Sequence, residues 1–159
     1  MIRVQREDFD PAAELARFSG NGAVGGVCMF LGLVRDYVGE ATDRRQDVSA
    51  MTLEHYPGMT EKQLEAIEAE ARRRWPLEDA LIVHRYGRLE AGERIVLVAT
   101  ASAHREAAFQ SCHFLIDWLK TKAPFWKVEH TAQGDTWVEA RDSDDQLAAR
   151  WGQPAPDRR

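Results

Sequence analysis

The chain has 159 residues, of which 44% are hydrophobic and 30% are charged, and its formal net charge at pH 7 is −5. This length and composition are typical of a single globular domain with its own hydrophobic core. The acidic balance argues against nucleic-acid binding, which needs a basic surface, and no apolar run approaches the roughly 18 residues of a membrane span.

The first ten residues, MIRVQREDFD, are charged and lack the apolar segment of a signal peptide, so we expect a cytoplasmic protein. The two cysteines, Cys28 and Cys112, are far apart and lie among apolar residues. They predict free buried thiols and not a disulfide or a metal site. The five histidines show no metal-ligand spacing, and no glycine-rich nucleotide motif is present, so we expect neither a metal nor a cofactor.

The N-terminal part predicts a strand over 2–5 and a helix over 11–18 that begins at a proline and buries Leu15 and Phe18. The run AVGGVCMFLGLV, residues 23–34, is almost continuously apolar. Its three glycines disfavour a helix. We therefore predict a central strand in which glycine marks a bulge or a close backbone approach.

The charged segment 36–47 predicts a loop, which is either a solvated connector or a lid. Residues 48–56 alternate partly in polarity and predict a strand with Met51 and Leu53 inward. A helix is then predicted over 60–74.

The start of this helix carries two local signals. Thr60 and Gln63 have the spacing of a capping box, and Met59 and Leu64 that of a hydrophobic staple. Leu64, Ile67 and Ala71 form its apolar stripe, and Trp75-Pro76 ends it.

Two strands are predicted over 80–86 and 94–101, joined by GRLEAGE. The second is apolar on both faces, which is typical of a central strand covered on both sides. His84 falls within the first strand and is interpreted as a structural residue.

A long helix follows, capped by Ser102 and stopped by Pro124. Its wide apolar face comprises Ala108, Ser111, Cys112, Leu115, Trp118 and Leu119. Its narrow polar stripe comprises Glu106, Gln110, Asp117 and Thr121.

The C-terminal part predicts a hairpin of strands 125–131 and 136–140 around a Gly134-Asp135 turn. A helical turn or two is expected within 142–151. The proline-containing segment 152–159 is expected to be a disordered tail, so the predicted domain covers 1–151.

Positive charge predominates in the segment that contains the long helix and the start of the strand after it. Between 102 and 127, the cations Arg105, Lys120, Lys122 and Lys127 outnumber the acids Glu106 and Asp117. His104 and Arg105 fall in the first helical turn, where free N–H groups favour an anion. Lys120 is about 24 Å further along the helix axis, at 1.5 Å per residue. One small anion therefore cannot contact both ends within one chain.

Lys127 follows the proline corner and can approach Lys120. Two ammonium groups held close together favour deprotonation of one of them, and a neutral lysine can act as a base or nucleophile. The alternative is a pair of solvent-exposed lysines.

Several segments closely resemble the catalytic, large subunit of molybdopterin synthase. These segments are TLEHYPGMTEK (52–62), ARRRWPL (71–77), TASAHR (100–105), LKTKAPFWK (119–127) and GDTWVEAR (134–141). The resemblance extends from about Gly22 to Trp151, and LEHYPGM and LKTKAPFWK are its most specific parts.

The resemblance implies an α/β fold of the hammerhead type, with antiparallel sheets and a long helix packed on them. It implies a homodimer in which each subunit binds a small ubiquitin-like sulfur-carrier subunit, giving a heterotetramer. The carrier's C-terminal Gly-Gly thiocarboxylate would enter a pocket and deliver sulfur to cyclic pyranopterin monophosphate. Two transfers build the dithiolene of molybdopterin.

The resemblance also implies site residues. Lys120 and Lys127 match the family's catalytic lysines, which would act in acid/base and electrostatic roles and also contact the substrate. The remaining substrate-binding positions are Arg35, His104, Arg105, Val128, Glu129 and Arg141. Because the family pocket draws on both halves of a dimer, Arg105 need not reach Lys120 within one chain.

Two departures from the family are visible. Leu33 stands where several relatives carry a lysine, and the 36–47 loop is longer than in the relatives. The rival interpretations are a non-catalytic module that binds a ubiquitin-like partner or a phosphorylated metabolite, and an RNA-binding protein, which the charge balance disfavours.

Overall fold

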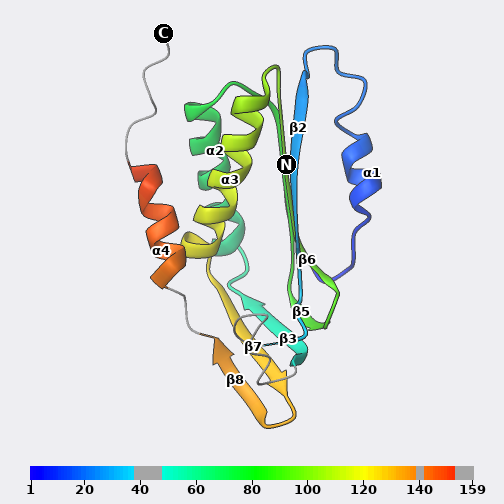
Figure 1. The fold of residues 1–159 in the computed structure, drawn as a ribbon, viewed down its shortest axis with the longest axis vertical. Helices are drawn as coiled ribbons and strands as arrows, with labels where there is room; N and C mark the ends of the chain where they lie inside the picture. Colours follow the sequence, from blue (N-terminus) through cyan, green and yellow to red (C-terminus); the bar gives the residue numbers. More distant parts are fainter. Residues whose placement is uncertain (38–47, 139–141, 153–159) are drawn as a thin grey trace.

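The computed structural model describes residues 1–37, 48–138 and 142–152. The elements in chain order are β1 (Ile2–Gln5), α1 (Pro11–Ala16), β2 (Gly26–Leu33), β3 (Val48–His55), α2 (Met59–Arg74), β4 (Leu77–Arg85), β5 (Gly87–Glu90), β6 (Arg94–Ser102), α3 (Arg105–Lys122), β7 (Phe125–Thr131), β8 (Gly134–Val138), α4 (Asp142–Ala149) and the 3-10 turn η1 (Arg150–Gly152). They form two four-stranded sheets with helices packed on them, which confirms the predicted α/β class (Figure 1). No helix within the described residues is long and apolar enough to cross a membrane.

The first sheet has the strand order β1-β4-β6-β2. Its β4–β6 and β6–β2 pairs are antiparallel, whereas β1 pairs with β4 in parallel. This sheet therefore adds one parallel pair to the antiparallel pairing that we expected. The crossover between β1 and β4 spans most of the N-terminal half, as a parallel pair requires a long connection.

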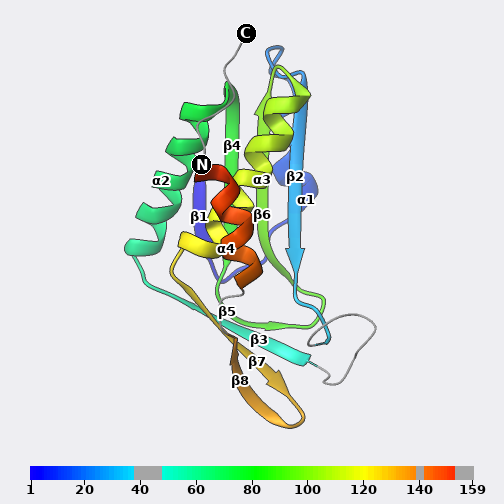
Figure 2. The ribbon, with the colours of Figure 1, turned by 60° about the vertical axis from the view of Figure 1, so that its left-hand side comes forward.

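Helices cover both faces of this sheet (Figure 2). On one face, α2 and α3 pack against each other and bury a core that includes Leu64, Phe114 and Leu115 together with Ile82 and Val98 of the sheet. The other face packs against Phe9 and Phe18, which flank α1. Strand β6 alternates between these two cores, so the prediction of a central strand covered on both sides is confirmed for it.

The second sheet has the order β5-β3-β7-β8 and lies beyond one end of the first sheet (Figures 1 and 2). A third core, made of Val34, Met51, Leu53 and Leu89, joins the two sheets. Met51 and Leu53 are buried as predicted, and so are Val48 and Ala50. Strand β5 was missed because only four residues within the GRLEAGE connection form it.

Strand β2 is an edge strand, so its predicted central position is wrong. Its apolar side chains Val27, Met29, Phe30 and Leu33 are between 37% and 49% exposed. The predicted close approaches at glycine are confirmed. A Cβ at Gly25 would lie 2.1 Å from the carbonyl oxygen of Ala103, and the β2–β6 register shifts between Gly32 and Leu33.

The predicted caps are displaced by two residues. Helix α2 is capped at Gly58, whose N–H donates to Glu61 at 2.7 Å, while Thr60 is buried and its hydroxyl donates to the Tyr56 carbonyl. Met59 is 57% exposed, so the predicted staple does not bury it. Helix α3 is capped at His104, because the Ser102 hydroxyl instead donates to the Pro76 carbonyl at 2.7 Å.

Three smaller expectations also changed. Helix α1 ends at Ala16 and leaves Leu15 39% exposed, whereas Phe18 is buried as predicted. The β7–β8 hairpin is confirmed, but Thr131 pairs with Gly134, so the turn lies at residues 132–133. Cys112 is buried and Cys28 partly buried, and both thiols are free; burial raises the pKa of Cys112.

Some predictions fall outside the described residues. These are most of the 36–47 loop, the end of the strand predicted to reach residue 140, Arg141, and residues 153–159 of the tail. The helical segment predicted within 142–151 is confirmed by α4 and η1.

Candidate active site

The corner between α3 and β7 holds the two predicted catalytic lysines. Lys120 is exposed in the last turn of α3, and among the described residues it has no hydrogen-bond or ion-pair partner. The helix ends at Ala123, whose N–H donates to the Leu119 carbonyl, and the Ala123 carbonyl accepts from Phe125. The chain reverses here because Pro124 cannot continue the helix. Lys127 follows on β7 and is partly buried.

The register of the second sheet shows what Lys127 faces. Lys127 pairs with Leu53, Phe125 with His55 and Glu129 with Met51. Paired residues of antiparallel strands point to the same face. Leu53 and Met51 belong to the core between the sheets, so Lys127 and Glu129 point toward this junction.

Two histidines occupy the same junction. His84 of β4 is 4% exposed, and its ring stacks on Phe125 at 3.7 Å between centroids with an interplanar angle of 16°. Burial lowers the pKa of His84 to about 4, and the charges of Lys127 and His55 add to this effect. His55 lies 4.4 Å from the Tyr86 ring, and its buried Nδ1 has no hydrogen-bond partner among the described residues. Lys127 therefore shares its surroundings with two imidazoles and aromatic rings.

The other end of α3 carries the residues that we expect to bind an anion. His104 is the N-cap residue and Arg105 the first helical residue; both are exposed, and the His104 side chain makes no capping hydrogen bond. The Gly25 N–H donates to the Ser102 carbonyl at 3.0 Å, which brings the start of β2 against this helix start. Free helix N–H groups with an arginine beside them suit a phosphate or carboxylate.

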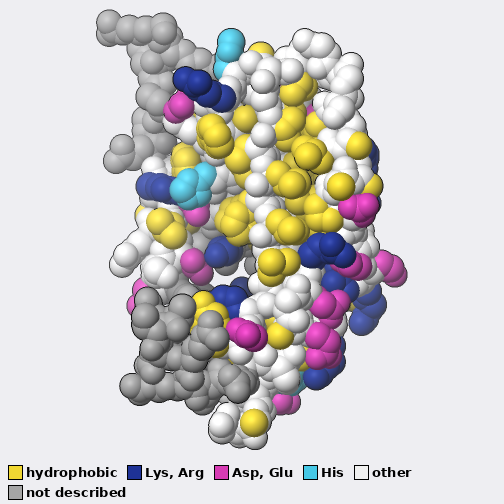
Figure 3. All heavy atoms as spheres, turned by 45° about the vertical axis from the view of Figure 1, so that its right-hand side comes forward, with side chains coloured by type: hydrophobic (Ala, Val, Ile, Leu, Met, Phe, Trp, Pro, Cys, Tyr) yellow, Lys and Arg dark blue, Asp and Glu magenta, His cyan; other side chains and the backbone are white. Residues whose placement is uncertain are grey.

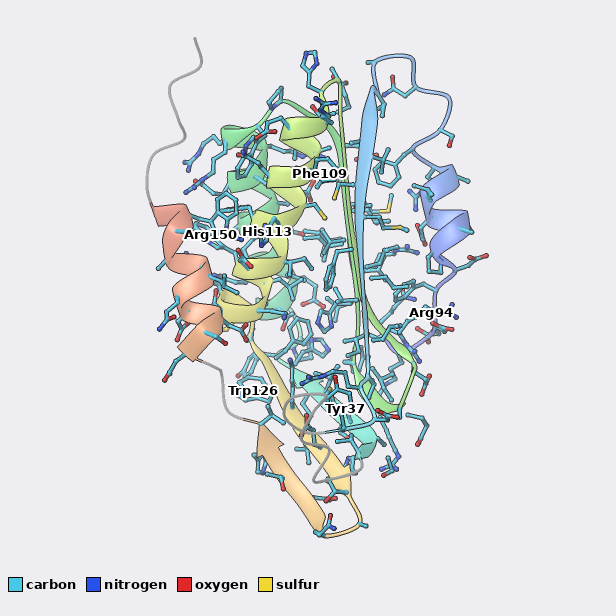
Figure 4. All side chains as sticks on the ribbon, viewed as in Figure 1. Tyr37, Arg94, Phe109, His113, Trp126 and Arg150 are labelled. Carbon is cyan, nitrogen blue, oxygen red and sulfur yellow. The ribbon has the colours of Figure 1, made fainter. Side chains whose placement is uncertain are left out.

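The predicted residues do not all come together within one chain. Arg105 and Lys120 are separated by the length of α3, about 22 Å at 1.5 Å per residue, as Figure 1 shows for the two ends of the helix. Arg35 follows β2 at the end nearer the second sheet and lies over the Tyr37 ring at 5.2 Å, with Tyr37 labelled in Figure 4.

The remaining predicted positions lie on or beyond β7. Glu129 shares a face with Lys127, whereas Val128 points to the opposite face, where it pairs with Thr52 and Trp137. Arg141 lies outside the described residues.

A third group lies beside the lysine corner and was not predicted. Asp117, expected on the polar stripe of α3, is 5% exposed and accepts hydrogen bonds from Arg150 Nη2 and Trp151 Nε1, both at 2.6 Å. Figure 4 shows Arg150 next to His113 between α4 and α3. The C-terminal segment therefore covers part of the stripe that helical periodicity placed in solvent.

The histidine pair at the sheet junction, close to Lys127, was also not predicted. The signal that could have found it is the position of His55 within the LEHYPGM segment, directly after a strand, combined with a second histidine in a strand that is otherwise apolar. No group of three or more metal-ligating side chains is arranged to hold a metal among the described residues.

Known proteins resemble the chain in sequence. Residues 4–122 match the family model described as MoaE protein. The molybdopterin synthase catalytic subunit of Pseudomonas aeruginosa is 56% identical over 151 residues, covering 94% of this chain and 97% of that protein. The corresponding subunit of Mesorhizobium japonicum is 50% identical over 153 residues, covering 94% and 92%.

Solved structures agree in fold. The molybdopterin biosynthesis MoaE protein of Burkholderia ambifaria is 52% identical with a TM-score of 0.79, covering 96% of this chain and 98% of that one. Molybdopterin synthase of Staphylococcus aureus is 29% identical with a TM-score of 0.77, covering 86% and 96%. A complex of subunits 1 and 2 of molybdopterin-converting factor from Helicobacter pylori, 17% identical with a TM-score of 0.69 and covering 88% and 91%, shares the fold. The chain therefore belongs to the MoaE family, the catalytic subunits of molybdopterin synthase.

Proposed function

We propose that the chain transfers sulfur from the C-terminal thiocarboxylate of a small ubiquitin-like carrier to cyclic pyranopterin monophosphate. Family membership makes the chain an enzyme of molybdenum cofactor biosynthesis. The observation that carries the finer proposal is the pair of lysines on the two sides of the Ala123-Pro124 corner, one exposed and one facing the sheet junction.

The two lysines differ in their surroundings, which suits different roles. Exposed Lys120 can meet an incoming anionic thiocarboxylate and stabilise its charge. Lys127 lies beside aromatic rings and the buried His84, where a charge interaction is stronger than in water. We assign proton transfer at the substrate carbon and stabilisation of the developing charge to this pair.

A second protomer completes the site in this proposal. The anion site at His104 and Arg105 is about 22 Å from Lys120 along one helix. A homodimer would place this end of one subunit near the lysine corner of its partner. Hydrophobic side chains gather on one face of the molecule (Figure 3), and those exposed on edge strand β2 support an interface there. Exposed apolar patches of this kind mark association surfaces.

The carrier subunit is the other partner that we propose. The Helicobacter pylori structure is a complex of two subunits of molybdopterin-converting factor. One carrier on each subunit of a homodimer gives a heterotetramer. We further propose that the enzyme works in the cytoplasm.

The proposal is tested with purified protein, a thiocarboxylated carrier and cyclic pyranopterin monophosphate. We expect product formation, and mass analysis should show that the carrier's C-terminus changes from thiocarboxylate to carboxylate. Lys120→Ala and Lys127→Ala should each reduce turnover by at least about a hundredfold. Lys122→Ala is the matched control, because Lys122 lies in the same last turn but its Nζ is 3.4 Å from the Trp118 ring centroid.

Carrier binding without turnover in the wild type would instead favour the non-catalytic binding module. Full turnover in Lys127→Ala would remove the lysine mechanism while leaving the sulfur-transfer activity in place.

The shared site has its own test. Arg105→Ala and Lys120→Ala proteins should each be nearly inactive, and mixing them should restore part of the activity, since some dimers then contain one intact site. Phe30→Glu should give monomers in light scattering after size exclusion, because a charge on β2 opposes burial of that strand. A monomeric wild type, or no recovery on mixing, would contradict the shared site.

A further inference from the structure

Three side chains on the second sheet are joined in a row by hydrogen bonds. The His130 ring lies between the other two, with Nε2 2.7 Å from Thr52 Oγ1 and Nδ1 2.7 Å from Asp135 Oδ1. The residues belong to β3, β7 and β8, which are neighbours in this sheet (Figure 2). Thr52 is partly exposed and Asp135 is exposed, so the row lies at the surface. It occupies the face of β7 opposite to Lys127 and is therefore separate from the lysine corner.

The partners of His130 determine the direction of both hydrogen bonds when its ring is neutral. A carboxylate can only accept, so Nδ1 donates its proton to Asp135. The lone pair is then on Nε2, which accepts a hydrogen bond from the Thr52 hydroxyl. The hydroxyl proton thus points at a base, and a carboxylate orients that base. This is the arrangement in which a hydroxyl acts as a nucleophile.

The residues across the strands from Thr52 supply the other parts of an acyl-transfer site. Arg88 of β5 pairs with Thr52, and paired residues point to the same face of a sheet. The Arg88 side chain is 55% exposed and bonds to Glu90 at 3.1 Å. A guanidinium beside the nucleophile can stabilise the oxyanion that forms during acyl transfer. On the other side, Val128 pairs with both Thr52 and Trp137. Trp137 is 62% exposed, so an apolar surface for an organic group continues this row.

We propose that Thr52, His130 and Asp135 form a second active site, which hydrolyses small carboxylic esters that carry an apolar group. Thr52 Oγ1 attacks the ester carbonyl carbon, and His130 Nε2 takes the hydroxyl proton and passes it to the leaving alcohol as the C–O bond to that alcohol breaks. Water then attacks the acyl ester on Thr52, its proton returns through Nε2 to the Thr52 oxygen, and the carboxylic acid leaves. Thr52 and His130 are catalytic residues in this scheme, and Asp135 is a positioning residue.

The probe is p-nitrophenyl acetate, whose cleavage is followed by the absorbance of p-nitrophenolate. We expect the wild type to release p-nitrophenolate and to carry an acetyl group on the peptide that contains Thr52, detected by mass analysis after an acid quench. Thr52→Val keeps the shape of the side chain and removes the hydroxyl. It should abolish the acetylated peptide and slow release by at least about tenfold, while the rate of sulfur transfer stays at the wild-type value.

Thr136→Val is the matched control, because Thr136 lies in the same sheet but pairs with Glu129 on the opposite face. Its release rate should equal that of the wild type. Asp135→Asn should slow acetylation of Thr52 by at least about tenfold, since an amide can donate to Nδ1 and favour the wrong tautomer of His130. Asp135→Glu keeps the carboxylate and should restore part of the rate. An acetylation rate unchanged in Asp135→Asn would overturn the positioning role.

A wild type without acetylated Thr52, or a Thr52→Val variant as fast as the wild type, would overturn the proposal. Release that is slowed by His130→Ala but not by Thr52→Val would also overturn it, because the imidazole would then act on the ester directly. If the row only links the strands, Thr52→Val should lower Tm and the wild type should accept no acetyl group. The peptide measurement uses the unaltered protein, so it decides the question even where a variant does not fold.

Discussion

Replacing Asp117 by Ala should release the C-terminal segment from α3 and lower the stability of the whole domain. The Asp117 side chain is 6% exposed and accepts hydrogen bonds from Arg150 and Trp151, both at 2.6 Å. The Trp151 ring in turn packs edge-on against Trp75 and Phe114, each at 5.7 Å between centroids. The Asp117 carboxylate thus holds both the Arg150 guanidinium and the Trp151 ring against α3.

The magnitude follows from the two hydrogen bonds. A hydrogen bond to a charged group contributes about 1.5 to 3 kcal/mol. Arg150 is 40% exposed, so water screens its bond and the lower end of that range applies. Together the two bonds predict a loss of about 3 kcal/mol in the free energy of unfolding for Asp117→Ala. For a domain of this size, the expected fall in Tm is about 6 to 12 °C.

The assay is thermal unfolding followed by circular dichroism, with urea unfolding to obtain the free energy. Trp151→Phe should show roughly half of the loss, about 1.5 kcal/mol, because it removes one bond and keeps the ring. Glu65→Ala on the exposed side of α2 is the control and should leave Tm unchanged within about 2 °C. A Tm for Asp117→Ala equal to that of the control would refute this account of the C-terminal segment.

Two further predictions concern stability. The pKa of His84 is lowered from 6.5 to about 4 in the folded chain. The unfolded state therefore binds more protons between these values, and the free energy of unfolding should fall as pH drops through that window. Between pH 7 and pH 4.5, urea unfolding should show a smaller loss of this free energy in His84→Gln than in the wild type, and equal losses would contradict a neutral buried His84. Gly25→Ala should destabilise the protein by about 1 to 3 kcal/mol, because the new Cβ would lie 2.1 Å from the Ala103 carbonyl oxygen. Gly22→Ala is the control and should be tolerated, because nothing lies within 4 Å of its new Cβ. Similar Tm values for the two variants would argue against the close approach.

The spacing of apolar residues predicted the buried faces correctly where the elements that cover them belong to the same chain. The apolar stripe of α2 and the two apolar faces of β6 were predicted correctly, because each is covered by neighbouring elements of the same domain. The same reasoning failed for β2, whose apolar residues are exposed at a sheet edge. Apolar residues predict burial but do not say whether the covering surface belongs to the same chain or to another one.

The helix caps and the exposure of Asp117 were predicted wrongly for a different reason, which is that contacts between distant segments determine them. Ser102 has the residue type of an N-cap, yet its hydroxyl bonds to Pro76, 26 positions away. Asp117 has the spacing of a solvent-facing residue, yet Arg150 and Trp151 cover it. Such pairings depend on the tertiary fold, which helical and strand periods do not contain.

The lysine corner was predictable in outline because it is local: a helix end, a proline and a strand follow one another within eight residues, from Lys120 to Lys127. The histidines beside it were not, because β3, β4 and β7 bring them together only in the folded protein. Figure 4 shows that β7, with Trp126 labelled, continues directly from the end of α3.

Helix α3 carries His104 and Arg105, which we propose bind an anion, at its start and Lys120 in its last turn. An insertion or deletion of one residue between them would rotate one end by about 100° relative to the other and change their separation by about 1.5 Å. Because a helix tolerates neither change without disturbing its buried side, the number of residues between Arg105 and Lys120 should be the same in every active homologue. Variation among homologues should therefore be confined to which side chains occupy the intervening turns.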